Sequence, residues 1–454
     1  MKFWNAVQDD QTCPACAFRH GREVREGGLP SPPHARCKNV NGCRCKEVEN
    51  PIEVTNFSSE IPKFVAGPSK PRLLWIGDAA CATGFARATH YTLEVLRETW
   101  DVSVLGLNYL GDPHSYPYPI YPCYPGGDAF GVRRTKEMVE KIRPDLVVVQ
   151  NDPWNLPAYM KQIVDVPIVG VVAVDGKNCR ATSMNGIALA IFWTKFGADE
   201  ARAGGYLGPS EVIPLGVDLN IYKPMDKQEA RAALGLPKHM QEGFIVGNVN
   251  RNQPRKRLDL MVSYFAEWVK TFEVEDAYLF LHVAPTGDQG YDVKQLMHYY
   301  GMKGKLILSE PNIGQGDPEE LLVQTYNCFD VQATTTQGEG MGLTTLEGMA
   351  CEVVQIAPRW SALGDWAKDA AVMVDCSEIC TTPNMLNVIG GVPSRGQFVA
   401  ELDTLYNHAD VREDWRKRGL ALAHDPMFNW RNIGERFAKV LEKFRVSSEK
   451  VANG

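Results

Sequence analysis

The sequence predicts an α/β protein with two doubly wound domains that face each other. Short, nearly continuous apolar segments alternate with amphipathic helical segments, which is typical of parallel sheets covered on both faces. The alternation occurs as two consecutive series, and a chain of 454 residues with 44% hydrophobic residues is too long for one typical domain. Ligands of such sheets bind beyond the carboxyl ends of the strands, so we expect the site in a cleft between the domains.

The composition and the net charge disfavour some classes of function. The net charge of −7 provides no global basic field that would draw the protein to nucleic acid or to an anionic membrane. No apolar run reaches the roughly 20 residues that span a bilayer, and the N-terminus lacks a signal-peptide pattern. We therefore expect a cytoplasmic protein, in the host cytoplasm if the gene is viral, without a membrane span.

Five of the 12 cysteines lie in the first tenth of the chain, where His20 and His34 also lie. They are Cys13, Cys16, Cys37, Cys43 and Cys45. A segment with so few aliphatic residues could hardly fold by burial alone, whereas four soft ligands hold zinc tetrahedrally. The pattern predicts a structural zinc bound by the first three cysteines and one of the last two. A reduced, poorly ordered tail is the alternative.

Changes in composition divide the chain into five parts. Residues 1–50 form the cysteine-rich module, and residues 51–70, with prolines and charges, form a linker. Residues 71–215 and 216–428 carry the two alternating series. Residues 429–454 contain a final amphipathic helix, which we expect to pack across the two domains.

The first series contains apolar strands at 72–78, 101–107, 145–150 and 167–175, with helical segments between them. A Tyr- and Pro-rich stretch, 108–131, interrupts this alternation. Long loops in compact domains are usually functional, which favours an acceptor-side loop. The alternative is a loop that has only a structural role and is packed by its own tyrosines.

The second series contains strands at 244–250, 278–285, 305–310, 331–335 and 352–358. The stretch after the fourth of these strands, QGEGMGLTTLEGMA, joins a glycine-rich turn to the start of a helix. Its glycines permit backbone angles that are closed to other residues, and the amides at the start of the helix suit an anion. An ordinary strand, turn and helix is the alternative interpretation.

Two carboxylates and two cations are the candidate chemical groups of this second series. Glu339 lies in the turn and Glu347 in the helix, so we expect them to have different tasks. Arg251 and Lys256 follow the first strand of the series, where fixed cations can hold a diphosphate and stabilise it as a leaving group. No D-x-D motif occurs in the sequence, so these cations would replace a catalytic metal. A solvated basic turn is the alternative.

Four motifs in this order resemble the family-4 retaining glycosyltransferases, which have the GT-B fold. They are VIPLGVD (212–218), R-x4-K at Arg251 and Lys256, GEGMGLTTLEGMA (338–350) and FNWRNIGERF (428–437). The resemblance covers roughly residues 70 to 445. It implies a nucleotide-diphosphate sugar donor, for which UDP-glucose is the default, and transfer of a hexose with retention of configuration.

The resemblance also implies roles for single residues. Arg251 and Lys256 would clamp the diphosphate, Glu347 would bind the ribose hydroxyls, and Glu339 would face the donor sugar. The backbone amides of Met341, Gly342 and Leu343 would hold sugar and phosphate oxygens, and Gly84 would approach the diphosphate from the first domain. The chain departs from the family at Asp175, where many members carry a histidine beside the sugar. This acid could bind sugar hydroxyls or help to deprotonate the acceptor, or it could be a structural turn residue.

The acceptor is open at this stage. The pattern CPxC, HG and LPxPPHxxC in residues 13–37 resembles the cysteine-rich tail of Mu-type phage head-morphogenesis proteins. A viral origin suggests a hydroxymethylated pyrimidine in phage DNA, while glycan, lipid-linked and protein hydroxyls are alternatives. A catalytically silent GT-B binding protein is a rival hypothesis that the complete set of charged residues disfavours. An epimerase or phosphorylase is disfavoured because no matching motif occurs.

Overall fold

The computed structural model describes residues 70–81, 83–284, 290–309, 317–382 and 387–444, and the backbone of three short strands nearer the N-terminus. These strands are β1 (Lys2–Asn5), β2 (Glu23–Val24) and β3 (Lys46–Val48), and β1 pairs antiparallel with both others. They belong to a unit of their own, residues 1–60. The five cysteines and two histidines considered as zinc ligands lie outside the described residues.

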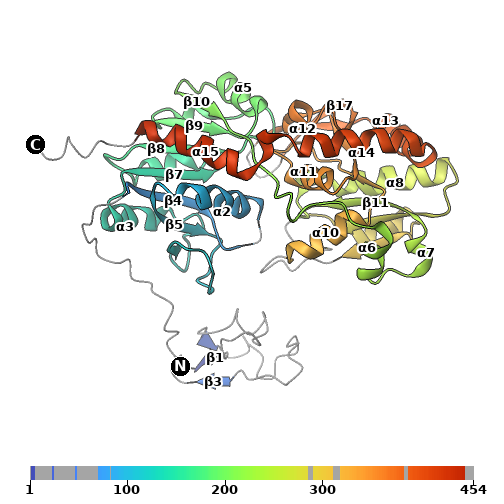
Figure 1. Cartoon of the computed structure of the whole chain (residues 1–454), viewed down its shortest axis with the longest axis horizontal. Helices are drawn as coiled ribbons and strands as arrows, with labels where there is room; N and C mark the ends of the chain where they lie inside the picture. The colour runs from blue at the N-terminus through green and yellow to red at the C-terminus, as the bar shows by residue number, and fades with distance from the viewer. Residues whose placement is uncertain are drawn as a thin grey trace, which may run out of the picture. The chain divides into compact units, whose positions relative to one another are not determined.

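The first domain is built on a sheet with seven described strands, all parallel, in the order β10-β9-β8-β7-β4-β5-β6 (Figure 1). The strands are β4 (Arg72–Asp78), β5 (Asp101–Leu107), β6 (Ile120–Pro122), β7 (Leu146–Asn151), β8 (Ile168–Val172), β9 (Leu189–Phe192) and β10 (Ser210–Val212). The helices are α2 (Gly84–Leu96), α3 (Val132–Ile142), α4 (Leu156–Met160) and α5 (Lys195–Ala203). The chain reverses its direction of winding beside β4, which lies between β5 and β7.

The second domain repeats this plan with six described parallel strands in the order β13-β12-β11-β14-β15-β16. The strands are β11 (Phe244–Val249), β12 (Ala277–His282), β13 (Leu306–Ser309), β14 (Val331–Ala333), β15 (Val354–Pro358) and β16 (Val372–Val374). The helices of this part are α6 (Lys227–Ala233), α7 (Lys238–Gln241), α8 (Leu258–Thr271), α9 (Val293–Tyr299), α10 (Glu319–Asn327), α11 (Leu343–Ala350), α12 (Ser361–Trp366), α13 (Arg395–Asn407) and α14 (Ala409–Ala423). Its winding reverses beside β11, which lies between β12 and β14.

Local sequence explains these elements. Every residue of β7, LVVVQN, is buried, as expected for a central parallel strand covered on both faces. Helix α2 begins after Thr83, whose hydroxyl accepts a hydrogen bond from the amide of Ala86. The predicted pair of doubly wound domains is thus confirmed.

The Tyr- and Pro-rich stretch 108–131 differs from a plain loop. It contains β6, which pairs with β5 and forms one edge of the first sheet. Tyr116 stacks on His90 of α2 with 3.4 Å between ring centroids, and the hydroxyl of Tyr118 lies 2.8 Å from the same imidazole. The stretch is therefore packed by its own tyrosines, because an extended chain without regular hydrogen bonds needs such contacts to be ordered.

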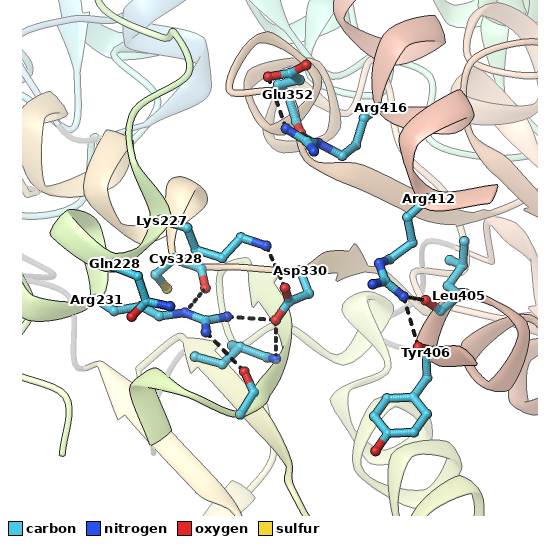
Figure 2. A network of polar contacts seen from close by, with 12 residues as sticks. Lys227, Gln228, Arg231, Cys328, Asp330, Glu352, Leu405, Tyr406, Arg412 and Arg416 are labelled. Carbon is cyan, nitrogen blue, oxygen red and sulfur yellow. Dashed lines mark hydrogen bonds and ion pairs between the residues drawn. The ribbon is translucent and has the colours of Figure 1, made fainter. Parts of the chain in front are cut away.

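A buried polar network stabilises the amino end of the second sheet (Figure 2). Arg231 of α6 donates to Asp330 Oδ2 at 2.6 Å, and Lys227 Nζ lies 2.5 Å from Asp330 Oδ1. Burial by itself raises the pKa of Asp330, but the two cations outweigh burial and the pKa is lowered. Asp330 also accepts from the backbone amide of Ile245 at 2.7 Å, so the network joins α6 to the starts of β11 and β14.

The final helix, α15 (Trp430–Leu441), lies beside α2 of the first domain (Figure 1). Trp430 stacks on Tyr91 with 4.9 Å between centroids, and Arg431 forms an ion pair with Glu98. The sequence predicts a helix that packs across the two domains, whereas these contacts of α15 are with the first. The reason is its apolar face, which α2 buries.

Among the elements that the sequence did not predict is the antiparallel hairpin of β17 (Cys376–Thr381) and β18 (Ile389–Pro393). It follows β16. Of the helices in the described ranges, none combines the length and apolar character that a bilayer crossing requires.

Candidate functional site

The predicted site residues lie at the carboxyl edges of the two sheets, most of them where the winding of a sheet reverses. Arg251 and Lys256 follow β11, and Glu339 follows β14, so they share the carboxyl edge of two neighbouring strands. In open α/β sheets this edge is where ligands bind. Gly84 follows β4 and Asp175 follows β8 on the corresponding edge of the first sheet.

Glu339 is the centre of a buried ion-pair cluster. Its carboxylate lies 2.5 Å from Lys256 Nζ and 3.1 Å from Arg255 Nη1, and its backbone amide donates to Ser361 Oγ at 2.9 Å. The residue is only 7% exposed. Burial raises the pKa of Glu339, but the charges of Lys256 and Arg255 outweigh burial and bring it to about 2. Glu339 is therefore an anion whose two oxygens have fixed orientations.

Arg255 is a site residue that sequence reasoning missed. Its guanidinium contacts Glu339, donates to the carbonyl of Gly338 at 2.8 Å, and lies 3.3 Å from Asp175 Oδ2. Arg251, which the sequence favoured, has an exposed side chain, and its charge acts on Asp78 at the end of β4. The run of three basic residues at 255–257 was the available signal, but only the fold reveals which of them point at the turn.

The turn after β14 is aligned along the segment after β11 by several hydrogen bonds. Gln337 N–H donates to the carbonyl of Arg255 at 2.9 Å, and Thr335 Oγ1 donates to the carbonyl of Arg257 at 2.8 Å. Residues Pro254–Lys256 form a 3-10 turn, η2. This pairing sets the positions of Lys256 and Arg255 relative to Glu339, although they are more than 80 residues apart in sequence.

The glycines of this turn serve two different purposes. Gly342 has a φ of 85°, in the left-handed region, and starts α11, as the sequence predicts. Gly338 and Gly340 are not in that region, so the predicted reason is wrong for them. A Cβ at Gly338 would lie 1.9 Å from the carbonyl oxygen of Asp175, and one at Gly340 would lie 3.1 Å from Ala173 Cβ. Their role is the close approach of the first domain.

Glu347 is buried in α11 and binds across the two domains. One of its oxygens pairs with Nη1 of Arg87 in α2, and the other accepts from the hydroxyl of Tyr326 at 2.6 Å. Arg87 also lies 3.7 Å from Glu319. Arg87 is a second residue that sequence reasoning missed, because no local pattern links it to a glutamate 260 positions away.

The starts of α2 and α11 approach each other. A Cβ added at Gly84 would lie 3.1 Å from Leu343 Cδ1, and the carbonyl of Met341 accepts from Trp366 Nε1 at 2.8 Å. Within the described residues, no side chain caps the amides at the start of α11. The structure therefore brings Gly84 to the segment of Met341, Gly342 and Leu343, and helix N-termini in this arrangement favour an anion.

Asp152, after β7, is a further acid at this edge. Burial, followed by the negative charge of Asp175, raises the pKa of Asp152 to about 7. An acid of this kind is protonated in the folded protein at a pH where ordinary aspartates, with a pKa near 4, are ionised. Perturbed acids concentrate at functional sites, so Asp152 extends the candidate site.

The raised pKa of Asp152 predicts a dependence of stability on pH. Between about pH 4 and pH 7 the folded state binds the additional proton, so the free energy of unfolding should fall as the pH rises through this window. Across this window the free energy of unfolding should fall by about 4 kcal/mol at most. The free energy of unfolding, measured with urea, should differ less between pH 5 and pH 7.5 for Asp152→Asn than for the wild type. The exposed control Asp112→Asn should show the wild-type difference. Equal differences in all three proteins would contradict the assignment.

The described residues include no group of three or more His, Cys, Asp and Glu side chains placed to hold a metal ion. The groups assembled at the candidate site are instead two helix starts, the cations Arg87, Arg251, Arg255 and Lys256, and the acids Glu339, Glu347, Asp152 and Asp175. This set suits a ligand that carries both phosphate and hydroxyl groups.

Solved structures that resemble this chain include a glycosyltransferase from Rickettsia africae, with a TM-score of 0.62 at 13% identity, covering 84% of this chain and 100% of that one. The sucrose-phosphate synthase of Thermosynechococcus elongatus superposes with a TM-score of 0.66 at 16% identity, covering 83% of this chain and 99% of that one. Anabaena Alr3699/HepE in complex with UDP and glucose superposes with a TM-score of 0.62 at 16% identity, covering 82% and 100%. The chain therefore has the GT-B fold.

Curated relatives are also glycosyltransferases. The D-inositol 3-phosphate glycosyltransferase of Nocardia farcinica is 28% identical over 245 residues, which are 53% of this chain and 47% of the relative. That of Segniliparus rotundus is 27% identical over 202 residues, or 41% and 43% of the two chains. The chain thus spans less than half the length of these relatives. A search of family models found no match.

Proposed function

We propose that the protein is a retaining glycosyltransferase that moves a hexose from a nucleotide-diphosphate sugar, UDP-glucose by default, to an acceptor hydroxyl. The observation that carries the proposal is the cluster of Glu339 with Lys256 and Arg255 at the reversal point of the second sheet. Electrostatic stabilisation of a departing diphosphate needs preorganised cations of this kind. The similarity to glycosyltransferases in both sequence and fold supports it.

In this proposal the donor lies between the carboxyl edges of the two sheets. Arg251 and Lys256 hold the diphosphate, and the amides of Met341, Gly342 and Leu343 bind sugar and phosphate oxygens. Glu347 accepts hydrogen bonds from the ribose, and Glu339 faces the sugar. Gly84 lets the start of α2 approach the diphosphate without a clash.

The reaction exchanges one bond to the anomeric carbon. The bond to the diphosphate oxygen breaks, the acceptor oxygen attacks the same face, and the acceptor proton passes to the departing diphosphate. Binding and charge stabilisation then supply most of the catalysis, which suits a site with cations and oriented amides. Asp175 would bind a sugar hydroxyl or help to deprotonate the acceptor.

The relatives favour a small acceptor, since D-inositol 3-phosphate appears in the names of the two curated ones. A hydroxymethylated pyrimidine in DNA stays a prediction that none of the relatives described above supports. Glycan, lipid-linked and protein hydroxyls stay open as alternatives. The rival hypothesis is a catalytically silent binding protein, and a measured transferase activity would exclude it.

The decisive experiment is incubation of the full chain with UDP-glucose, with and without pooled acceptors, followed by mass spectrometry. We expect slow hydrolysis of the donor alone and a product heavier by one hexose with the correct acceptor. If no nucleotide sugar in a pooled set is hydrolysed or transferred, the protein is a binding protein. Addition of EDTA should leave hydrolysis unchanged, because cations from the chain replace a metal at the donor. Elemental analysis of the same sample tests the predicted N-terminal zinc.

A further inference from the structure

The turn that carries Asp175 is held by the second domain. Lys177 and Ile389 exchange two backbone hydrogen bonds, with N···O distances of 2.9 and 3.0 Å. The side-chain amide of Asn178 donates to the carbonyl of Asn387 at 2.8 Å. Residues 175–178 belong to the first domain, so this short antiparallel pairing adds a strand-like contact across the domains.

The partner of this turn is the hairpin β17–β18, which is itself fixed to the Glu339 turn. Gly391 N–H donates to the carbonyl of Gln337 at 2.9 Å. The side-chain amide of Gln337 donates to Thr382 Oγ1 at 2.6 Å. One side of the hairpin therefore contacts the turn after β14, and the residues that begin β18 contact the turn after β8.

The space between the turn and the hairpin admits no additional atom. A Cβ at Gly176 would lie 2.5 Å from the carbonyl oxygen of Ile389 and 2.9 Å from Val388 Cγ1. Real Cβ atoms do not approach a backbone oxygen so closely, and backbone cannot rotate away as a side chain can. Lys177 adds a cation–π contact, with Nζ 5.0 Å from the ring centroid of Trp360.

These contacts decide where the carboxylate of Asp175 lies. Asp175 immediately precedes Gly176, and its Oδ2 lies 3.3 Å from Arg255 Nε. Its side chain is 27% exposed, so burial alone does not fix it. A displacement of the turn by about 1 Å would break this contact, while Lys256 and Glu347 would keep their own partners.

We infer that the hairpin β17–β18 is a positioning element that holds Asp175 at the sugar end of the donor site through its pairing with Lys177. The inference rests on the proposed function, because the sugar is the group that Asp175 would meet. It assigns Gly176 and Ile389 as positioning residues. Turnover should depend on them, whereas nucleotide affinity should not.

The test is Gly176→Ala in the full chain, with Gly396→Ala as the matched control, since a Cβ at Gly396 meets no atom within 4 Å. The rate of UDP-glucose hydrolysis should fall at least about 10-fold, because small misplacements in an active site are costly. The dissociation constant of UDP, measured by calorimetry, should change less than about 2-fold. The control Gly396→Ala should match the wild type in the rate of hydrolysis and in the dissociation constant of UDP.

A double variant separates positioning from a general loss of structure. If Gly176→Ala acts through Asp175, then adding it to Asp175→Asn should cause little further loss of hydrolysis, since residues in one contact are not additive. An unchanged rate for Gly176→Ala, additive losses, or a parallel loss of UDP affinity would each overturn the inference. A wild-type chain that hydrolyses and transfers no nucleotide sugar of a pooled set would instead overturn the proposed function, and the inference with it.

Discussion

Replacing Lys256 with alanine is expected to lower the rate of sugar transfer by roughly 10²-fold or more, the usual effect of removing one preorganised donor. Lys256 is buried and in direct contact with Glu339, so its ammonium is fixed before the donor binds. The negative charge of a departing diphosphate would compete with Glu339 for the ammonium group of Lys256. Steady-state rates of UDP-glucose hydrolysis and transfer provide the measurement.

The comparison variants for this prediction are Lys303→Ala, which removes an exposed lysine of the same domain, and Arg251→Ala. Lys303→Ala should retain the wild-type rate. Arg251→Ala should also reduce the rate, because the proposed clamp uses both cations. Thermal unfolding must also be measured, because the carboxylate of Glu339 would lose one of the two cations described above and a broken buried pair costs stability. Near-normal turnover of a folded Lys256→Ala protein would refute the proposed clamp.

Glu347→Gln is expected to weaken UDP binding by about 10-fold or more, because hydrogen bonds to a charged group contribute roughly 1.5–3 kcal/mol. One oxygen would become a donor that cannot accept from a ribose hydroxyl. The amide would also lose the charge that pairs with Arg87. Calorimetric titration with UDP measures the change directly.

Two glutamates serve as comparisons for Glu347. Glu352→Gln changes an acid that pairs with Arg416 at 3.1 Å (Figure 2), away from the candidate site, and should leave UDP affinity unchanged. Glu339→Gln should reduce turnover more than UDP affinity, since its proposed partner is the sugar. Equal losses of UDP affinity in Glu339→Gln and Glu347→Gln would show that the two acids do not divide their tasks as proposed.

The domain plan could be predicted because its signals are local. The apolar runs RLLWIGD and DVSVLGL became β4 and β5 with the predicted ends, because a strand buried on both faces must be apolar along its length. Short interruptions were harder to interpret. The strand β6 lies within a stretch so rich in tyrosine and proline that its pattern suggested a loop, and only its pairing with β5 makes it a strand.

The candidate site could be predicted in part. The spacing of Glu339 and Glu347 around a glycine turn predicted a site at the carboxyl end of a strand, and the structure places Glu339 after β14. The contacts between the domains could not be predicted, since Arg87, the partner of Glu347, and Asp175, the partner of Arg255, both come from the first domain. Among the basic residues after β11, the backbone of the 3-10 turn decides that Arg255 and Lys256 face Glu339.

The sequence by itself therefore determined most of the central strands and the identity of the charged groups that follow them, because these depend on periodicity and residue type. Only the tertiary structure decided which charges form pairs, why Gly338 and Gly340 must lack side chains, and that the hairpin β17–β18 holds the turn of Asp175. Such contacts join segments at least 80 residues apart, and their geometry depends on how the two sheets meet. Periodicity along the chain carries no information about that approach.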